Sequence, residues 1–166
     1  MRLSGVSFSN ASTLMAKGVL EGYGQILGNV TVTNATPCFV RPGGTGAAGE
    51  LRIGGAYQQR SGILNLEIGG VSPGSGYDVL SVTNGVTLSA CTIAITNLAG
   101  FKPPAGASAF DVVTGSSVTT NGATIVLPPA ADGVGWSAVV ATLADGRKAL
   151  RVSSVVRSRG AILLVR

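Results

Sequence analysis

The acidic side chains are the groups of this 166-residue chain that could perform acid–base chemistry, because it contains no histidine. Histidine is the commonest general base and metal ligand, so the seven carboxylates remain as candidates. Glu67 and Asp78 could line up on adjacent coils of a repetitive fold, and paired carboxylates cleave polysaccharides. Arg52 and Arg60 lie nearby in sequence, as a lyase would require. The structural alternative places Glu67 on the outer side of a strand and uses Asp78 to cap the turn at Gly76-Tyr77.

No other motif in the chain predicts catalysis. No phosphate loop, zinc motif or nucleophile elbow occurs, and the glycines at 43, 44 and 46 are not followed by a helix pattern. We therefore predict that the protein is not an enzyme and that it has no catalytic residue, no cofactor and no metal.

The segment AYQQRSG contains the candidate contacts for a glycan: Tyr57, Gln58, Gln59 and Arg60. An exposed Tyr57 with glutamine and arginine beside it could bind sugar by ring stacking and hydrogen bonding. The alternative is that these side chains form a stacked polar ladder on the outer face of a sheet.

Three sequons make Asn10, Asn29 and Asn34 candidate sites of N-glycosylation. Such triplets also arise by chance in a chain rich in serine, threonine and asparagine. If the source is a eukaryote or a virus of one, they indicate a glycosylated surface protein.

The two cysteines, Cys38 and Cys91, are too few for a disulfide framework and do not have the spacing of a zinc site. They are either two unpaired small apolar residues or the partners of one disulfide. The sequence does not place the two sulfur atoms relative to one another.

The elements that would position these residues are short alternating strands separated by glycine corners. From Gly49 to Val82 the strands ELRI, ILNLEI and YDVLSV alternate with corners such as Gly54-Gly55 and Gly69-Gly70. The pattern of apolar strand, glycine corner and apolar strand recurs, with about 20 residues expected in each coil. Two-residue hairpin turns are scarce, Asp145-Gly146 being the clear example, so the pattern favours a solenoid over a sandwich. We predict an all-β fold, a right-handed parallel β-helix (β-solenoid) with a C-terminal capping hairpin.

Composition is consistent with this class of fold. The apolar fraction is 45%, enough for a core, while charged residues make up 11%, against about 25% in ordinary soluble domains. The net charge of +5 arises from six basic residues after position 146, which either contact an anionic surface or protect a sheet edge. These alternate with valine and leucine instead of clustering with aromatic residues, so we predict no nucleic-acid partner. No signal peptide and no apolar stretch long enough for a membrane span is visible.

The chain divides into three expected regions. Residues 1–17 are predicted to be an irregular N-terminal segment or an incomplete first coil, residues 18–127 the β-solenoid coils, and residues 128–166 the capping hairpin and basic tail. The open ends of a solenoid need a cap or a neighbour, so we expect the hairpin to be the cap and Val19–Val32 to be a stacking surface.

The order of several segments resembles the passenger β-helix of autotransporter-type bacterial surface proteins. The segments are GYGQILGNVTVTNAT, GELRIGGAYQQRSGILNLEIGG, GYDVLSVTNGVTL, GFKPPAGASAFDVVTG and, in the region of the hairpin, GVGWSAVVATLADGRKALRV. The resemblance covers roughly residues 18 to 152 and implies the C-terminal part of such a helix, displayed outside the cell, with no cofactor and no catalytic set. It does not extend to a translocating barrel, to a long N-terminal array or to the tail SVVRSRGAILLVR.

These observations predict a non-catalytic structural and adhesive β-solenoid module of an extracellular fibre or surface protein. The alternatives are a viral or phage spike or glycan-binding module, and a polysaccharide-cleaving β-helix enzyme. The expected partners are other copies or neighbouring subunits, by end-to-end or lateral stacking, and surface glycans. The expected location is extracellular or on a cell or virion surface.

Overall fold

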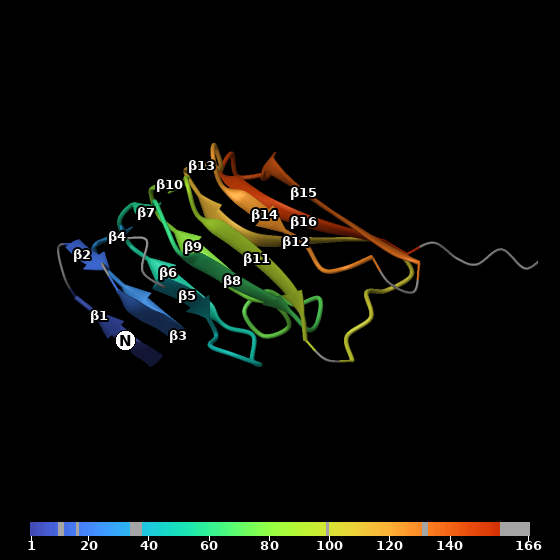
Figure 1. Ribbon diagram of the computed structural model, residues 1–166, viewed down its shortest axis with the longest axis horizontal. Coiled ribbons are helices and arrows are strands. Elements are labelled where there is room, and N and C mark those ends of the chain that lie inside the picture. The colour runs from blue at the N-terminus through green and yellow to red at the C-terminus, as the bar shows by residue number, and fades with distance from the viewer. Residues whose placement is uncertain (10–11, 16, 34–37, 99, 131–132, 157–166) are drawn as a thin grey trace, which may run out of the picture.

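The structure is a computed structural model that describes residues 1–9, 12–15, 17–33, 38–98, 100–130 and 133–156. Within these ranges the chain forms strands, turns and loops that follow one another along a single axis (Figure 1). No helix that is long and apolar enough to cross a membrane occurs among the described residues.

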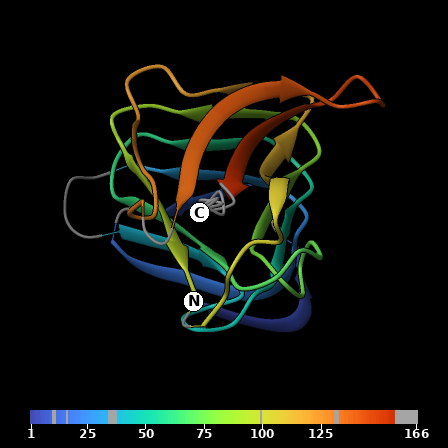
Figure 2. The same cartoon turned by 90° about the vertical axis from the view of Figure 1, so that its right-hand side faces the viewer.

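Three columns of parallel strands build a β-solenoid of about three turns, which confirms the predicted fold class. The first column contains the first half of β3 (Gly18–Ile26), β5 (Cys38–Pro42), β8 (Ile63–Ile68), β11 (Thr92–Asn97) and β14 (Thr124–Val126). The second column contains β1 (Arg2–Phe8), the second half of β3, β6 (Glu50–Ile53), β9 (Val79–Val82) and β12 (Gly106–Gly115). The third column contains β2 (Ser12–Met15), β4 (Asn29–Val32), β7 (Tyr57–Gln59), β10 (Gly85–Leu88) and β13 (Ser117–Thr119). Viewed from the C-terminal end, the strands surround one central axis (Figure 2).

β3 serves two columns because it bends at its glycines. Its residues up to Gly22 pair with β5, and its residues from Gly24 pair with β6. Both glycines have positive φ, 105° and 137°, where other residues are strained. A side chain at Gly22 would also place its Cβ 1.8 Å from the carbonyl oxygen of Leu3. Glycine at this corner therefore permits both the bend and the approach of β1.

The core is made of inward-facing apolar side chains that stack in register from turn to turn. In the first column Leu20 lies on Val40, Val40 on Leu64, and Leu64 on Ile93. All four are fully buried. The second column continues the pattern, with the stack Leu51, Leu80, Val113 and Leu150. Burying such side chains stabilises the fold by roughly 1.5–3 kcal/mol each.

Turn length increases along the chain, unlike the constant value of about 20 residues expected from the sequence. Leu20 and Val40 are 20 positions apart, Val40 and Leu64 are 24 apart, and Leu64 and Ile93 are 29 apart. The additional residues lie between the first and second columns, in a first crossover loop (residues 43–49) and a second crossover loop (residues 69–78). The columns themselves keep their register.

The C-terminal hairpin confirms the prediction made from Asp145-Gly146. β15 (Val134–Thr142) and β16 (Lys148–Val156) are antiparallel, and β16 pairs with β12 to extend the second column. Leu150 is buried in the core, and the Trp136 ring lies 6.1 Å from that of Phe110, centroid to centroid. The hairpin therefore contributes apolar side chains to the C-terminal end of the core.

The N-terminal segment is more regular than residues 1–17 were expected to be. β1 pairs with β3 from Arg2 to Phe8, and β2 pairs with β4. A register shift between Ser4 and Val6 interrupts β1, and this irregularity explains why its pattern in the sequence is weak. The predicted stacking surface at Val19–Val32 is wrong in position, because β1 and β2 already cover those strands.

Candidate functional site

The carboxylates Glu67 and Asp78 do come together, but in one turn and not on adjacent coils. The backbone N–H of Glu67 donates to Asp78 Oδ2 at 2.9 Å, and the N–H of Asp78 donates to the carbonyl oxygen of Glu67 at 2.9 Å. Asp78 is fully buried. It cannot contact a polymer, so this pair does not form a polysaccharide-cleaving centre.

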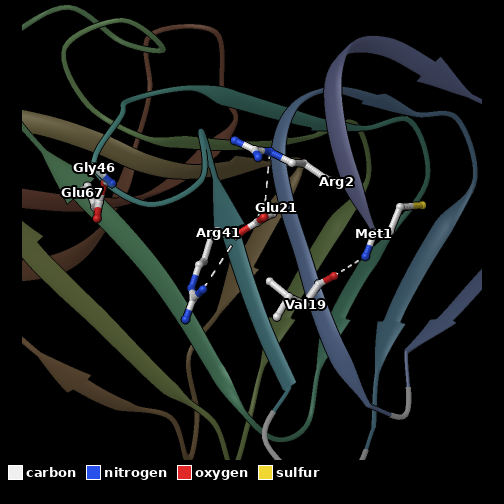
Figure 3. Close-up of polar contacts among 7 residues, drawn as sticks. All are labelled: Met1, Arg2, Val19, Glu21, Arg41, Gly46 and Glu67. Carbon is white, nitrogen blue, oxygen red and sulfur yellow. Dashed lines mark hydrogen bonds and ion pairs between the residues drawn. The ribbon is translucent and has the colours of Figure 1, made fainter.

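Asp78 connects the two crossover loops. Its Oδ1 accepts the backbone N–H of Gly49, 29 residues earlier, at 2.9 Å. Close by, Glu67 Oε2 accepts the N–H of Gly46 at 2.7 Å, and the two residues are drawn in Figure 3. Burial raises the pKa of Asp78 to about 8, and the nearby Glu67 carboxylate acts in the same direction against the two backbone hydrogen bonds. The sequence predicted a local turn cap, whereas Asp78 acts as a link between turns.

Glu21 forms a second charged cluster, on the outer side of the first column. It lies 3.9 Å from Arg2 and 4.0 Å from Arg41, which approach it from β1 and β5 (Figure 3). The Arg41 guanidinium also lies over the Phe39 ring, 4.6 Å from its centroid. The N-terminal ammonium of Met1 donates to the carbonyl oxygen of Val19 in the same region (Figure 3). These contacts attach the first turn to its neighbours.

The expectation that Tyr57 is exposed is wrong. Tyr57 and Gln59 face inward on β7 and are fully buried, and the tyrosine hydroxyl donates to Gln59 Oε1 at 2.6 Å. Gln59 Nε2 donates in turn to the carbonyl oxygen of Ser61 at 3.1 Å. Gln58 and Arg60 point outward, and the Arg60 guanidinium donates to Gln58 Oε1 at 3.0 Å. The neighbouring strands β4 and β10 explain why Tyr57 and Gln59 face inward. Both residues are in register with inward-facing apolar residues on these strands.

Cys38 and Cys91 are both free thiols and buried. They belong to one stack, in which Gly62 occupies the intervening turn. Two strand spacings separate their Cα atoms by about 9.6 Å, beyond the roughly 7 Å that a disulfide allows. Burial raises the pKa of both thiols. They therefore act as small core residues.

Of the three sequons, Asn29 is described, while Asn10 and Asn34 lie outside the described residues. Asn29 is exposed at the start of β4, and its Oδ1 accepts the backbone N–H of Ala56 at 2.7 Å. The side-chain oxygen of Asn29 thereby connects its own turn to the next turn of the solenoid.

An open groove of about 760 Å³ lies on the outer side of the second column. Its floor comes from β1, β3 and β6, and the two crossover loops contribute Gly49 and Pro73 to its walls. Its polar side chains include Gln25 and Arg52, which are register partners on neighbouring strands. The hydrogen bond from the Gly49 N–H to buried Asp78 fixes the position of the wall to which Gly49 belongs.

Tyr23 provides an aromatic surface in this groove. Its side chain is 50% exposed, although Gly5 and Gly49 approach it so closely that a Cβ on either would lie 3.3 Å from it. Ser4 Oγ donates to the tyrosine hydroxyl at 3.4 Å. The backbone of Gly5 therefore lies against the tyrosine ring and that of Gly49 against its Cβ, while half of the residue remains exposed. The GYGQ segment, with glycine on both sides of the tyrosine, is the sequence signal that could have identified it.

Charge in the groove is balanced. Glu50 and Arg52 are the charged residues of its lining, and their side chains form an ion pair of 2.7 Å. An aromatic surface with amide, hydroxyl and paired ionic groups suits a neutral ligand rich in hydroxyl groups.

Among the described residues there is no group of three or more histidine, cysteine or acidic side chains that could hold a metal ion.

The basic C-terminal segment is partly neutralised in the fold. Arg151 makes two hydrogen bonds to Asp111, at 2.7 and 2.9 Å, and Arg147 pairs with Asp145 at 2.7 Å. Lys148 donates to Thr142 Oγ1 at 2.6 Å. These three basic residues lie at the hairpin turn and on β16, which is paired on both sides, so their contacts order the hairpin and do not protect an open edge.

No family model, curated protein or solved structure gives a significant match to this chain.

Proposed function

We propose that this chain is a non-catalytic structural and adhesive β-solenoid module of an extracellular fibre or surface protein. The observation that carries the proposal is the unbroken apolar stack through successive turns, from Leu20 to Ile93. The described turns are hydrogen-bonded to one another through parallel strands and share one apolar core, so the turns resist separation. A rigid rod of this kind can hold a binding surface away from its point of attachment.

The extracellular location and the likeness to autotransporter-type passenger helices are parts of the same proposal. They are supported by the low content of charged residues, by the order of the segments that resemble such helices, and by the fold itself. Self-association with other copies and contact with surface glycans are the proposed partnerships.

Proteolysis of the purified chain tests the structural role. We expect the turns between residues 18 and 127 to survive as one protected unit, because cleavage requires exposed and locally unfolded backbone. Digestion of this region at the rate of an unfolded chain would contradict the proposal. Surface labelling of intact producing cells or virions would test the location.

A glycan-binding or spike module is the second candidate, and the groove around Tyr23 favours it. A sugar ring can stack on the exposed part of the tyrosine ring while Gln25 and Arg52 hydrogen-bond to its hydroxyl groups. The balanced charge of Glu50 and Arg52 favours a neutral glycan over an acidic one.

A glycan array followed by calorimetry tests this candidate. We expect Tyr23→Ala to abolish binding, because the stacking surface is lost, and Tyr23→Phe to retain most of it, because the ring remains. Leu27→Ala is the matched control, since Leu27 is exposed to a similar degree at 48% but does not line the groove. Binding that survives Tyr23→Ala would contradict a role for the groove.

Cleavage of the glycan is the less favoured alternative. Glu50 is the one carboxylate among the lining residues, and it is paired with Arg52, whereas glycoside hydrolysis ordinarily uses two carboxylates. We therefore propose binding without cleavage. Release of new reducing ends from a bound oligosaccharide, lost in Glu50→Gln, would reverse this assignment.

A further inference from the structure

The exposed sheet edges at the two ends of the solenoid differ in how well they are protected. Among the described strands, β2, β13 and β14 are edges of only three or four residues. Short edges offer little backbone for pairing with another chain. The longer edges are β1, with seven residues, and β15, with nine.

β1 carries two of the features that prevent edge pairing. Its register shifts between Ser4 and Val6, and Arg2 adds an exposed charge. Bulges and charges on an edge strand disfavour pairing with a neighbouring molecule.

β15 carries neither feature. It pairs with β16 through nine consecutive residues without a register shift, and it contains no charged residue and no proline. Of the described strands only β16 pairs with it, so its second edge has no strand partner within the part of the chain that the structure describes. Val139 and Val140 on this strand are 56% and 37% exposed. A long, regular and uncharged edge of this kind is an expected site of strand pairing.

We propose that β15 pairs antiparallel with β15 of a second copy of this chain, about a two-fold axis at Ala138. Ala138 is the middle residue of the strand, so all nine residues can pair. Val140 then lies opposite Trp136 of the second copy, and aromatic side chains opposite β-branched ones stabilise antiparallel pairs. No like charges face each other, because the strand has none.

Pairing of β15 with β15 of a second copy is more favourable than pairing of β15 with β1 of a second copy. Head-to-tail pairing would place β15 against β1, where the bulge and Arg2 oppose it. A two-fold interface, in which the same surface of both copies meets, is also the commonest arrangement among soluble homo-oligomers. The second-column sheets of both copies would become continuous, and the two Tyr23 grooves would belong to one assembly.

This inference rests on the self-association that the proposed function includes, but not on glycan binding. A mass measurement therefore tests it separately from the glycan array. If the chain forms larger assemblies in which β15 has no part, the pairing fails while the proposed structural role stands.

Sedimentation equilibrium of the full chain and of two variants is the first test. We expect twice the 16.5 kDa of one chain for the wild type, a monomer for Val139→Lys, and a dimer for Val155→Lys. Val155 is the matched control, because it is similarly exposed at 49% but lies on β16, which is paired on both sides. Circular dichroism would confirm that both variants are folded.

Cross-linking under mild oxidation is the second test. Two-fold pairing places Ala138 opposite its own copy, at a Cα separation of roughly 4.5–5.5 Å that a disulfide can span. We expect Ala138→Cys to form a covalent dimer and Ala144→Cys, in the exposed hairpin turn, to remain largely uncross-linked. A monomeric wild type, or a dimer that tolerates Val139→Lys and does not cross-link through position 138, would overturn the proposal.

Discussion

The apolar columns and the crossover region hold successive turns together in different ways. Leu20, Val40 and Leu64 stack through contacts that are the same in kind at each turn and that need no particular partner atom. In the crossover region, Asp78 accepts two directed hydrogen bonds, one of them from Gly49 in the preceding turn. The columns keep their register while the crossover loops change in length, and between the first and second crossover loops directed hydrogen bonds take the place of stacking.

The largest expected difference between the two regions is in their response to pH. The pKa of Asp78 is about 8 in the folded state and 3.8 in the unfolded chain. Stability from this group is therefore fully present below pH 4 and is lost as the pH rises to 8. The change is on the order of 5 kcal/mol, since each unit of pKa corresponds to about 1.4 kcal/mol.

Urea unfolding between pH 4 and pH 8 would measure this slope, and Asp78→Asn should flatten it. The series stops at pH 8 because burial raises the pKa of the Cys38 and Cys91 thiols, which titrate above that range. A slope that persists in Asp78→Asn would assign the pH dependence to other groups.

The column should respond to a cavity and not to pH. Leu64→Ala should lower the free energy of unfolding by about 3–5 kcal/mol, because the stacks above and below cannot close over the space. Asn65→Ala, one position along β8 and directed outward, is the control and should change it by less than about 0.5 kcal/mol. Similar losses at both positions would contradict a core built from alternate residues.

One polar pair inside the column sharpens the comparison, because Tyr57 and Gln59 bring directed hydrogen bonding into the stack. Tyr57→Phe should cost about 1–3 kcal/mol by leaving the buried Gln59 Oε1 without its donor. The double variant Tyr57→Phe, Gln59→Leu should recover much of this loss, because it removes both polar groups. Additive losses in the double variant, measured by urea unfolding, would show that the pair is not coupled.

The smallest effects are expected at the surface ion pairs. Arg151→Ala should cost about 1 kcal/mol, since Arg151 and Asp111 are partly shielded and joined by two hydrogen bonds. Arg52→Ala should change stability by roughly 0–0.5 kcal/mol, because its pair with Glu50 is more exposed. The reverse order in a thermal unfolding series would contradict this ranking.

Much of the fold could be predicted because its signals are local. The alternation in ILNLEI indicates a strand with one buried face, and Asp145-Gly146 indicates a hairpin turn. The candidate site was less predictable. Tyr57 was expected outside and lies inside, whereas Tyr23 lies in the groove and was not identified, because a tyrosine suits either face of a strand.

By itself, the sequence determined which residues form strands, where the chain turns, and that a core of stacked apolar side chains can form. These properties follow from side-chain alternation and from the conformational freedom of glycine, which act over a few residues. Only the tertiary structure decided which residues of one turn lie in register with which residues of the next. The crossover loops differ in length, so the pairing of Leu64 with Val40, the link from Asp78 to Gly49 and the support of Tyr23 by Gly5 depend on contacts between residues 18 to 29 positions apart. The packing of the whole stack selects that register, and no short segment contains it.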